Sequence, residues 1–250
     1  MVRKSKIDIR RDAIVELLHK EERVYVSKLS KLLGATEVTI RSDLTVLEQQ
    51  KKLMRVQGGA VLYPEAEKPV ISNSSQKEAI ANAVTEMISD GDTLFINCGT
   101  TTLCVAQALK QRRNLNVVTN SISVATALAD IPTIRVLLLG GELNAQYGFT
   151  YGANAQEQLS QYQARWAILA VDGVSKECGV TTYHAEEAIL DRMMIEGAGH
   201  ALIVADSSKI GRAGFSRICE CNKHLTLVTD HADPVVKAEL KDSEMKIKIV

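Results

Sequence analysis

The residues best suited to chemistry lie in short polar turns that follow apolar runs. In the clearest case, apolar residues 94–96 lead into the turn Gly99-Thr100-Thr101-Thr102, after which apolar residues recur at helical spacing. A strand that passes through a small, hydroxyl-rich turn into a helix N-terminus offers backbone N–H groups and hydroxyls to an anion. This stretch therefore indicates an anion-binding turn, which either does chemistry on the anion or only senses it.

Similar turns end the apolar runs that follow. Together the residues at these ends are Asn97, Gly99, Thr100, Thr101, Thr102, Asn120, Ser121, Gly140, Gly141, Asp172 and Lys209. One such turn carries little information, but a succession of them predicts a convergent polar pocket. The Thr hydroxyls suit a phosphate, with Lys209 as its counter-charge. Asp172 and Asn120 suit sugar hydroxyls.

The elements that would bring these turns together alternate in α/β fashion. The apolar strand candidates are residues 94–97, 116–119, 135–139, 166–171, 201–205, 225–228 and 246–249. Helical patterns between most of them predict an α/β domain with a mostly parallel sheet and helices on both faces. This domain spans residues 77–250. It follows a Pro- and Ser/Asn-containing linker at 63–76, and residues 1–62 remain for a second, small domain.

Charge is unevenly distributed along a chain whose formal net charge is zero. Residues 1–60 carry 13 Lys and Arg against 8 Asp and Glu, whereas the remainder carries 17 against 22, so the head suits a polyanion. No apolar run approaches the roughly 20 residues that span a membrane, and a secretory signal is absent, so a cytoplasmic protein is expected. The five Cys and five His are scattered, which favours free thiols and predicts neither a metal nor a cofactor.

The basic head has the pattern of a winged helix-turn-helix domain. A first amphipathic helix precedes a second, for which Ser27 is the expected N-cap and Gly34 the end. A short turn then leads to a third helix, which Thr36 can cap. Helices joined by a short Gly-containing turn are typical of the helix-turn-helix motif. Two short strands around Gly58 and Gly59 predict a wing.

The third helix carries polar residues in its first turns. Glu37, Thr39, Arg41 and Ser42 occupy the positions where a recognition helix meets base edges and flanking phosphates. A three-helix packing module with a solvated polar face would show a similar pattern. DNA binding is the favoured interpretation because the head is also basic.

The stretch "EVTIRSDLTVLEQQKKLMRVQGGAVL" resembles the recognition helix and wing of the DeoR family of bacterial transcriptional regulators. "CGTTT", "VVTNS", "LLLGGEL", "AVDGV" and "ADSSKIGR" are similar, in order, to motifs of that family's sensor domain, so the resemblance covers nearly the whole chain. It implies a ribose-5-phosphate isomerase-like sensor domain and a repressor controlled by a phosphorylated sugar or sugar derivative. It also implies that Thr39 and Arg41 contact bases or backbone, and that Arg55 contacts a phosphate or the minor groove.

Several residues depart from the family's commoner pattern. Ser42 stands where a second Arg is frequent, and Lys51 stands where a Gly usually closes the helix. Asn97 and Cys98 replace an Asp-Ser pair, and Asn144 stands where a basic residue is common. The departures in the sensor domain bear on the effector's identity more than on its class.

Three aromatic residues, Tyr147, Phe149 and Tyr151, alternate shortly after the second Gly pair. Such a run either covers an effector as a loop or packs inside the domain in the ordinary way. The residues alone leave both interpretations open.

Two other functions compete with sensing. A sugar-phosphate isomerase needs a general base and donors for an enediolate, roles open to Asp172, Glu186, Glu187 and Lys209. However, the acidic and Lys-Gly-rich motifs of that isomerase are not reproduced. Glu187 and Arg192 are more simply the charged face of a helix whose Ala188, Ile189 and Met193 point inward. An adaptor with a vestigial pocket would not need the polar strand ends. The sequence therefore predicts a non-enzymatic repressor of a carbohydrate-utilisation operon, located at the nucleoid when bound. Its partners would be a double-stranded DNA operator, the effector and further copies of itself in a dimer or tetramer.

Overall fold

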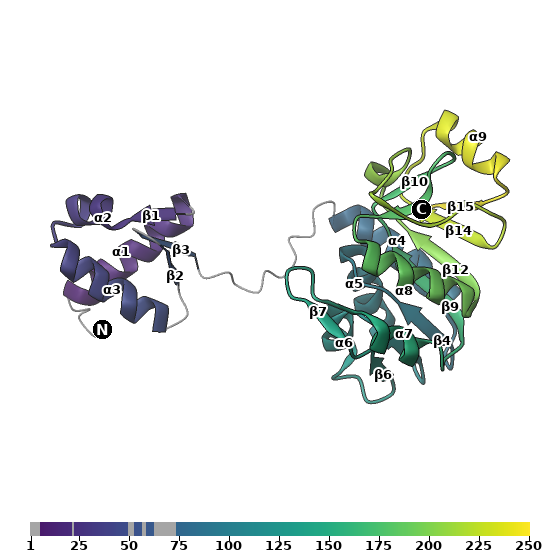
Figure 1. The fold of residues 1–250 in the computed structure, drawn as a ribbon, viewed down its shortest axis with the longest axis horizontal. Coiled ribbons are helices and arrows are strands. Elements are labelled where there is room, and N and C mark those ends of the chain that lie inside the picture. Colours follow the sequence, from purple (N-terminus) through teal and green to yellow (C-terminus); the bar gives the residue numbers. More distant parts are fainter. Residues whose placement is uncertain (1–5, 22, 50–52, 57–58, 63–73) are drawn as a thin grey trace. The chain divides into compact units, whose positions relative to one another are not determined.

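The structure is a computed structural model that describes residues 6–21, 23–49, 53–56, 59–62 and 74–250. The chain forms two compact units, Met1–Val70 and Ile71–Val250 (Figure 1). Most of the predicted linker, residues 63–73, lies outside the described residues, as do Lys51 and Gly58. The last three residues of that linker instead begin a helix, α4 (Ser74–Met87). Among the described residues, no helix is long and apolar enough to cross a membrane.

The described residues of the N-terminal unit form three helices and a small antiparallel sheet. The elements are α1 (Lys6–Glu21), β1 (Arg23–Tyr25), α2 (Val26–Leu33), α3 (Glu37–Gln49), β2 (Leu53–Val56) and β3 (Gly59–Leu62). Ile14, Leu29, Ile40, Leu44 and other buried residues form one core between them. The predicted helices and the two wing strands are confirmed, whereas β1, which is only three residues long, was not predicted from the sequence.

Strand β1 leads directly into α2 and pairs closely with the wing strand β3. The N-cap position of α2 is occupied by Tyr25 and not by Ser27, so the prediction of Ser27 as N-cap was wrong. The helix begins earlier because Val26 is buried in the core. β1 also pairs with β3 at Gly59, where a Cβ atom would lie 1.9 Å from the Val24 carbonyl oxygen. Glycine at this position permits the close approach.

A buried carboxylate joins α1 to α3. Asp43 is 2% exposed, and its two oxygens accept hydrogen bonds from the Nε atoms of Arg10 at 2.6 Å and Arg11 at 2.9 Å. Two cations on one carboxylate leave a net positive charge in the cluster. One acidic side chain therefore links α1 to α3, in addition to the apolar core that the two helices share.

We expect Asp43→Ala to destabilise the N-terminal unit by about 3 kcal/mol, because it leaves two guanidinium groups without their partner. This figure is the low end of the destabilisation that follows loss of one partner of a buried ion pair, because the side chains of the two arginines are 21% and 24% exposed. Amide hydrogen exchange in α1 and α3 of the full chain should accelerate about a hundredfold. Glu16→Ala, an exposed acid of α1, is the control. Equal exchange in the two variants would contradict the assignment.

The C-terminal unit is built on a seven-stranded sheet in which every pairing is parallel. The strands are β4 (Thr93–Ile96), β5 (Asn116–Thr119), β6 (Arg135–Leu138), β9 (Ala164–Ala170), β12 (Ala198–Val204), β14 (Leu225–Thr229) and β15 (Lys246–Ile249). Their order across the sheet is β15-β14-β12-β9-β4-β5-β6. The predicted α/β fold with a mostly parallel sheet is confirmed, since each predicted strand is present within a few residues of its expected bounds.

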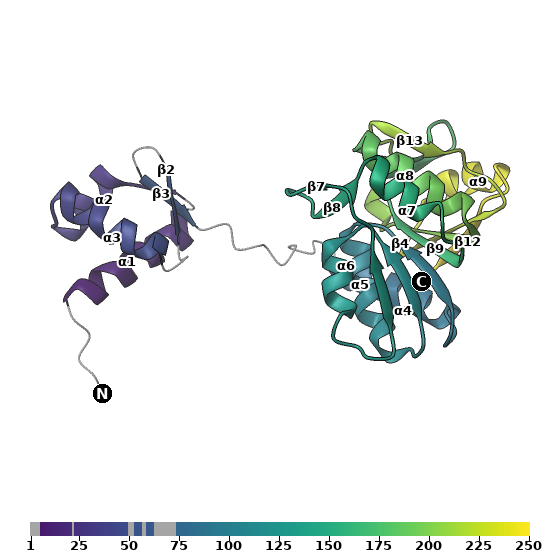
Figure 2. The same ribbon diagram turned by 60° about the horizontal axis from the view of Figure 1, so that its bottom comes forward.

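Helices cover both faces of this sheet (Figure 2). Residues of α4, α5 (Thr100–Ala108) and α6 (Ile122–Leu128) form one apolar cluster with the first face, which includes Ile96 and Ile168. Residues of α7 (Ala153–Leu159), α8 (Ala185–Glu196) and α9 (Pro234–Asp242) form another with the opposite face, which includes Phe95 and Leu169. Adjacent residues of one strand thus point to opposite cores, as the twofold period of a strand requires.

Short elements join the strands at the carboxyl edge of the sheet. They are the hairpin β7 (Glu142–Asn144) and β8 (Phe149–Tyr151), the antiparallel strands β10 (Gly173–Ser175), β11 (Gly179–Thr182) and β13 (Ser216–Cys219), and the 3₁₀ turn Ser207–Lys209. Another 3₁₀ turn, Leu109–Gln111, continues α5 toward the start of β5. The hairpin projects away from the sheet in Figure 2. These short strands, each of which is only three or four residues long, were not predicted from the sequence.

Candidate functional site

The site lies where the direction of strand addition reverses. From β4 the chain adds β5 and β6 on one side of the sheet and then crosses to add β9, β12, β14 and β15 on the other. After β4 it passes to α5 on one face, and after β9 it leads through β10 and β11 to α8 on the opposite face. The connections diverge between the carboxyl ends of β4 and β9, which is where open α/β sheets bind ligands.

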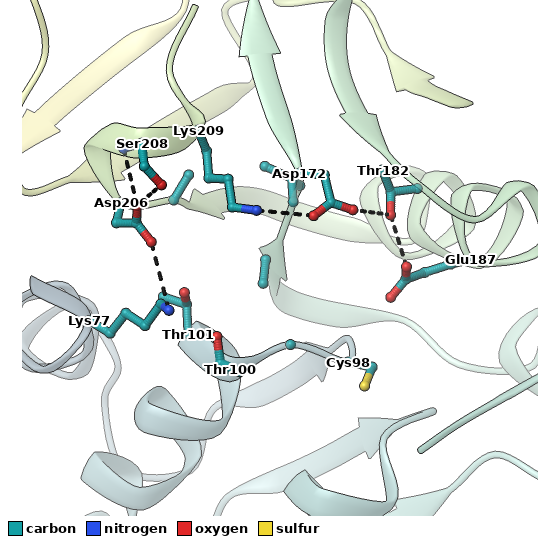
Figure 3. A pocket seen from close by; sticks show the side chains of 14 residues that line it. Lys77, Cys98, Thr100, Thr101, Asp172, Thr182, Glu187, Asp206, Ser208 and Lys209 are labelled. Atoms are coloured by element: carbon teal, nitrogen blue, oxygen red, sulfur yellow. Dashed lines mark hydrogen bonds and ion pairs between the residues drawn. The ribbon is translucent and has the colours of Figure 1, made fainter. Parts of the chain in front are cut away.

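A polar cavity of about 280 Å³ opens at this point (Figure 3). Its lining residues are Lys77, Cys98, Gly99, Thr100, Thr101, Ala170, Val171, Asp172, Thr182, Glu187, Ala205, Asp206, Ser208 and Lys209. They come from α4, from the ends of β4, β9, β11 and β12, and from α8. Among the residues predicted from the sequence, Gly99, Thr100, Thr101, Asp172 and Lys209 are brought together here.

The N-terminus of α5 forms one wall of the cavity. Its N-cap is Gly99, so no side chain caps the helix, and the N–H groups of its first turn are left for another acceptor. Gly99 packs so closely against β9 that a Cβ atom would lie 2.5 Å from the Cβ of Ala170. The hydroxyl of Thr102 donates to the carbonyls of Asn97 and Gly99 at 3.0 Å, which fixes the turn. This wall is suited to an anion.

Two lysines approach the same space, each beside an acid. The Nζ atom of Lys209 donates to Asp172 Oδ1 at 3.2 Å, and Lys77 forms an ion pair with Asp206 at 3.8 Å. Asp206 also accepts hydrogen bonds from the backbone and hydroxyl of Ser208. Figure 3 shows Lys77 and Asp206 at one end of the cavity and Lys209 reaching across toward Asp172. Both cations therefore line the same cavity as the N-terminus of α5.

The opposite end of the cavity is acidic. Glu187, 8% exposed, accepts a hydrogen bond from the Thr182 hydroxyl at 2.9 Å, and that hydroxyl also lies 3.3 Å from Asp172. Burial raises the pKa of the Glu187 carboxyl to about 7, and the charge of Asp172 adds to the rise while the Thr182 hydrogen bond opposes it. The lining thus holds three carboxyl groups against two lysines.

A second buried acid lies behind Glu187. Asp191 is fully buried and accepts hydrogen bonds from the Asn97 amide at 3.1 Å. Burial raises its pKa well above the ordinary value, and the neighbouring Glu187 adds to the rise. The same Asn97 amide group donates to the Ala170 carbonyl and accepts from the Ala170 N–H, so it joins β4 to β9. Asn97 is thus a positioning residue beneath the cavity.

The interpretation of α8 as carrying Glu187 on a solvated face was wrong. Glu187 and Asp191 are buried, whereas Ile189, which was expected to point inward, is 45% exposed. Ala188 is buried as expected. The helix is rotated from its expected orientation because its acidic residues are turned toward the carboxyl ends of β4 and β9. Arg192 donates to the backbone carbonyls of Ile218 and Arg217.

Four of the predicted effector residues lie away from the cavity. Asn120 and Ser121 are buried after β5, where Asn120 donates to the Thr150 carbonyl and Ser121 caps α6. Gly140 donates to Gln158 after β6, and Gly141 approaches the Tyr151 carbonyl. They do not line the cavity because β5 and β6 lie on the far side of β4 from β9.

The three aromatic residues do not share one environment, although the sequence left open whether they form a covering loop or pack inside the domain. Phe149 is buried and packs inside the unit, whereas Tyr147, at the tip of the β7–β8 hairpin, is 49% exposed. The carbonyl of Tyr147 accepts a hydrogen bond from the Cys98 thiol at 3.3 Å, which holds the hairpin tip beside the cavity. Its ring lies 4.5 Å from that of His184.

Sequence reasoning missed Lys77, Cys98, Thr182, Asp206 and Ser208 as lining residues. The motif "ADSSK" already contained two of them, so the polar end of β12 was the available signal. For Lys77 the sequence holds no such signal, because a lysine early in an amphipathic helix is ordinarily a surface residue. In the described part of the chain, no cluster of His, Cys, Asp and Glu side chains could hold a metal ion.

In the N-terminal unit, the predicted DNA-contacting residues lie on α3 and the wing. Thr36 caps α3 as predicted, with its hydroxyl accepting from the Thr39 N–H at 3.2 Å. Glu37 accepts a hydrogen bond from Arg41 at 3.0 Å, and the side chain of Ser42 is exposed beside them. Arg55 on β2 donates to the Thr45 hydroxyl at 3.0 Å, which connects the wing strand to the same helix.

Comparisons with known proteins cover both units. The DeoR-like helix-turn-helix domain matches residues 10–65, and the DeoR C terminal sensor domain matches residues 72–231. "HTH-type transcriptional repressor GlcR" of Bacillus subtilis (strain 168) is 33% identical, over 92% of this chain and 91% of its own length. "Glycerol-3-phosphate regulon repressor" of Escherichia coli (strain K12) is 31% identical, over 96% of this chain and 98% of its own length.

A likeness to solved structures is more remote. Ribose 5-phosphate isomerase A of Methanocaldococcus jannaschii is 13% identical, with a TM-score of 0.41 over 55% of each chain. The two domain matches and the full-length relatives agree with the winged N-terminal unit and the α/β unit described above. The chain belongs to the DeoR family of transcriptional regulators.

Proposed function

We propose that this protein represses a carbohydrate-utilisation operon and that a phosphorylated sugar or sugar derivative, bound in the cavity, controls its affinity for DNA. The observation that carries the proposal is the uncapped N-terminus of α5 facing Lys209 in one cavity. A phosphate at this point would meet free N–H groups and a lysine, and Asp172 would remain for sugar hydroxyls. The relatives' names, which include a glycerol-3-phosphate regulon repressor, support the class of effector.

The DNA-binding role falls to the N-terminal unit, with residues 1–62 and 77–250 as the two proposed domains. Arg41 and Arg55 are exposed and are held near α3 by single hydrogen bonds, so both can turn to phosphates or base edges. Two copies of the chain would present two such units to the half-sites of an operator in the cytoplasm. Control requires only that the effector prefer one arrangement by about a hundredfold, or roughly 2.7 kcal/mol.

A single set of measurements on the full chain tests this proposal. Duplexes enriched from a random-sequence library supply a DNA site, and anisotropy at several salt concentrations gives its affinity. Arg41→Ala should weaken binding at least tenfold at every salt concentration. A thermal-shift screen with glycerol 3-phosphate, hexose phosphates, pentose phosphates and inorganic phosphate should identify a stabilising compound, and that compound should change DNA affinity. If none of these anions stabilises the protein, the sensing proposal fails.

Sugar-phosphate isomerisation is the second candidate, because Glu187 lines the cavity with a pKa of about 7, close to what a general base requires. Family membership and the named repressors favour regulation. Incubation of the protein with each stabilising sugar phosphate, followed by proton NMR, separates the two. Conversion of aldose to ketose that disappears in Glu187→Gln would establish the enzyme; unchanged spectra are expected.

A further inference from the structure

One exposed apolar side chain lies on the polar surface of α3. Val38, the second residue of the helix, is 77% exposed, whereas Ile40, Leu44 and Leu47 are buried on the opposite side. Residues three and four apart share a face of a helix, so Val38 lies in line with Arg41, Ser42 and Thr45. A valine at this position neither packs in the core nor favours an exposed helix, because β-branched residues have low helix propensity.

The neighbours of Val38 form one continuous surface between α3 and the wing. Arg41 is held by Glu37 at 3.0 Å, and the Thr45 hydroxyl donates to the Arg41 carbonyl at 2.9 Å. The same Thr45 hydroxyl accepts from Arg55 of β2 at 3.0 Å. Two exposed arginines therefore bracket a face that begins with an apolar group in the first turn. This arrangement complements a polyanion whose groove contains an isolated apolar group.

Among the four bases of DNA, thymine alone presents an apolar group in the major groove, its C5-methyl. The first turns of a recognition helix are the part that reaches base edges, while arginines on the same surface contact phosphates or guanine. We propose that Val38 reads the C5-methyl group of one thymine in each operator half-site, within a few base pairs of the position contacted by Arg41. This inference rests on the proposed DNA-binding function and adds a residue that determines its sequence preference.

The test removes the methyl group from the DNA and the side chain from the protein. The full-length chain enriches its half-site from a random-sequence duplex library. Each thymine in that site is then replaced singly by uracil, which changes only the methyl group, and affinity is measured by anisotropy at fixed salt. One thymine in each half-site should show about fivefold weaker binding on replacement. In Val38→Ala, that replacement should have no effect.

Two variants on the same face are controls. Ser42→Ala should retain the full uracil penalty, because it leaves Val38 in place. Arg41→Ala should bind more weakly to every duplex but keep the same uracil-to-thymine ratio. Circular dichroism should be unchanged in Val38→Ala, since the side chain is exposed.

The outcomes separate this inference from the function on which it rests. If the chain enriches no sequence at any salt concentration, DNA recognition itself is wrong. If a site is enriched but Val38→Ala keeps the uracil penalty, or if no thymine shows one, the assignment of Val38 is overturned while DNA binding stands. The assignment is also overturned if Val38→Ala loses affinity, relative to the wild type, by the same factor for the thymine duplex and the uracil duplex, because the uracil penalty then persists.

Discussion

Glu187→Gln is expected to stabilise the C-terminal unit at pH 8 by about 3 kcal/mol relative to the wild type. Burial raises the pKa of the Glu187 carboxyl from 4.5 to about 7, so the folded state holds this proton more tightly than the unfolded state. The favourable contribution is full below about pH 4.5 and is lost as pH rises through 7. Glutamine is neutral throughout and can still accept the Thr182 hydrogen bond.

The measurement is urea denaturation followed by the fluorescence of Trp166, the single tryptophan, which lies on β9. The two proteins should be similar in stability near pH 5 and should diverge as pH rises to 8. Glu186→Gln is the matched control, because Glu186 precedes it on α8 but is exposed. A stabilisation of the same size in Glu186→Gln, or a pH-independent difference in Glu187→Gln, would show that the buried charge is not the cause.

The same charge bears on ligand binding. With Glu187 ionised, the cavity lining holds three carboxylates against two lysines, which opposes the entry of an anion. A sugar phosphate that binds the wild type should therefore bind more weakly as pH rises above 7. Glu187→Gln should remove this dependence, although the phosphate's own titration near pH 6 affects both proteins alike.

The sequence predicted the sheet and part of the cavity because both depend on local signals. Short apolar runs mark most of the strands, and Gly99, Asp172 and Lys209 follow three of them within a few residues. The order of strands in the sheet depends on contacts between distant segments. Asn120 and Gly140 follow their strands in the same way, yet β5 and β6 lie on the other side of β4. Sequence alone could not separate the strand-end residues that line the cavity from those that do not.

Glu187 and Lys77 show a second limit, which concerns helices. A charged residue in an amphipathic helix usually faces water. Glu187 was therefore expected on a solvated face, and Lys77 was not singled out from the sequence. Here the carboxyl ends of the strands provide polar surroundings, and a charged side chain can be buried there with partners. Thr182 contacts Glu187, and Asp206 forms an ion pair with Lys77. Glu187 and Lys77 line the cavity because of how their helices pack on the sheet, and the helical period of the sequence does not predict that packing.

Lys209→Met is expected to weaken sugar phosphate binding by about a hundredfold, the upper range for loss of one charge-assisted hydrogen bond. Lys209 follows β12 on a short 3₁₀ turn, and its Nζ atom is 3.2 Å from Asp172 across the cavity from α5. Methionine keeps much of the side chain's length and removes the charge. Titration calorimetry with the most stabilising sugar phosphate of the screen, and with inorganic phosphate, gives the affinities.

This variant should lose the effector's influence on DNA while keeping DNA affinity itself, because the substitution lies in the C-terminal unit. Its folding should be little affected, since the Lys209–Asp172 pair is 38% and 42% exposed and such pairs contribute about 1 kcal/mol or less. Lys176→Met is the matched control, because Lys176 also pairs with an aspartate, Asp242, at 3.1 Å, away from the cavity. If both variants bind the sugar phosphate equally well, Lys209 is not its counter-charge, and the anion must be held by α5 and Lys77 alone.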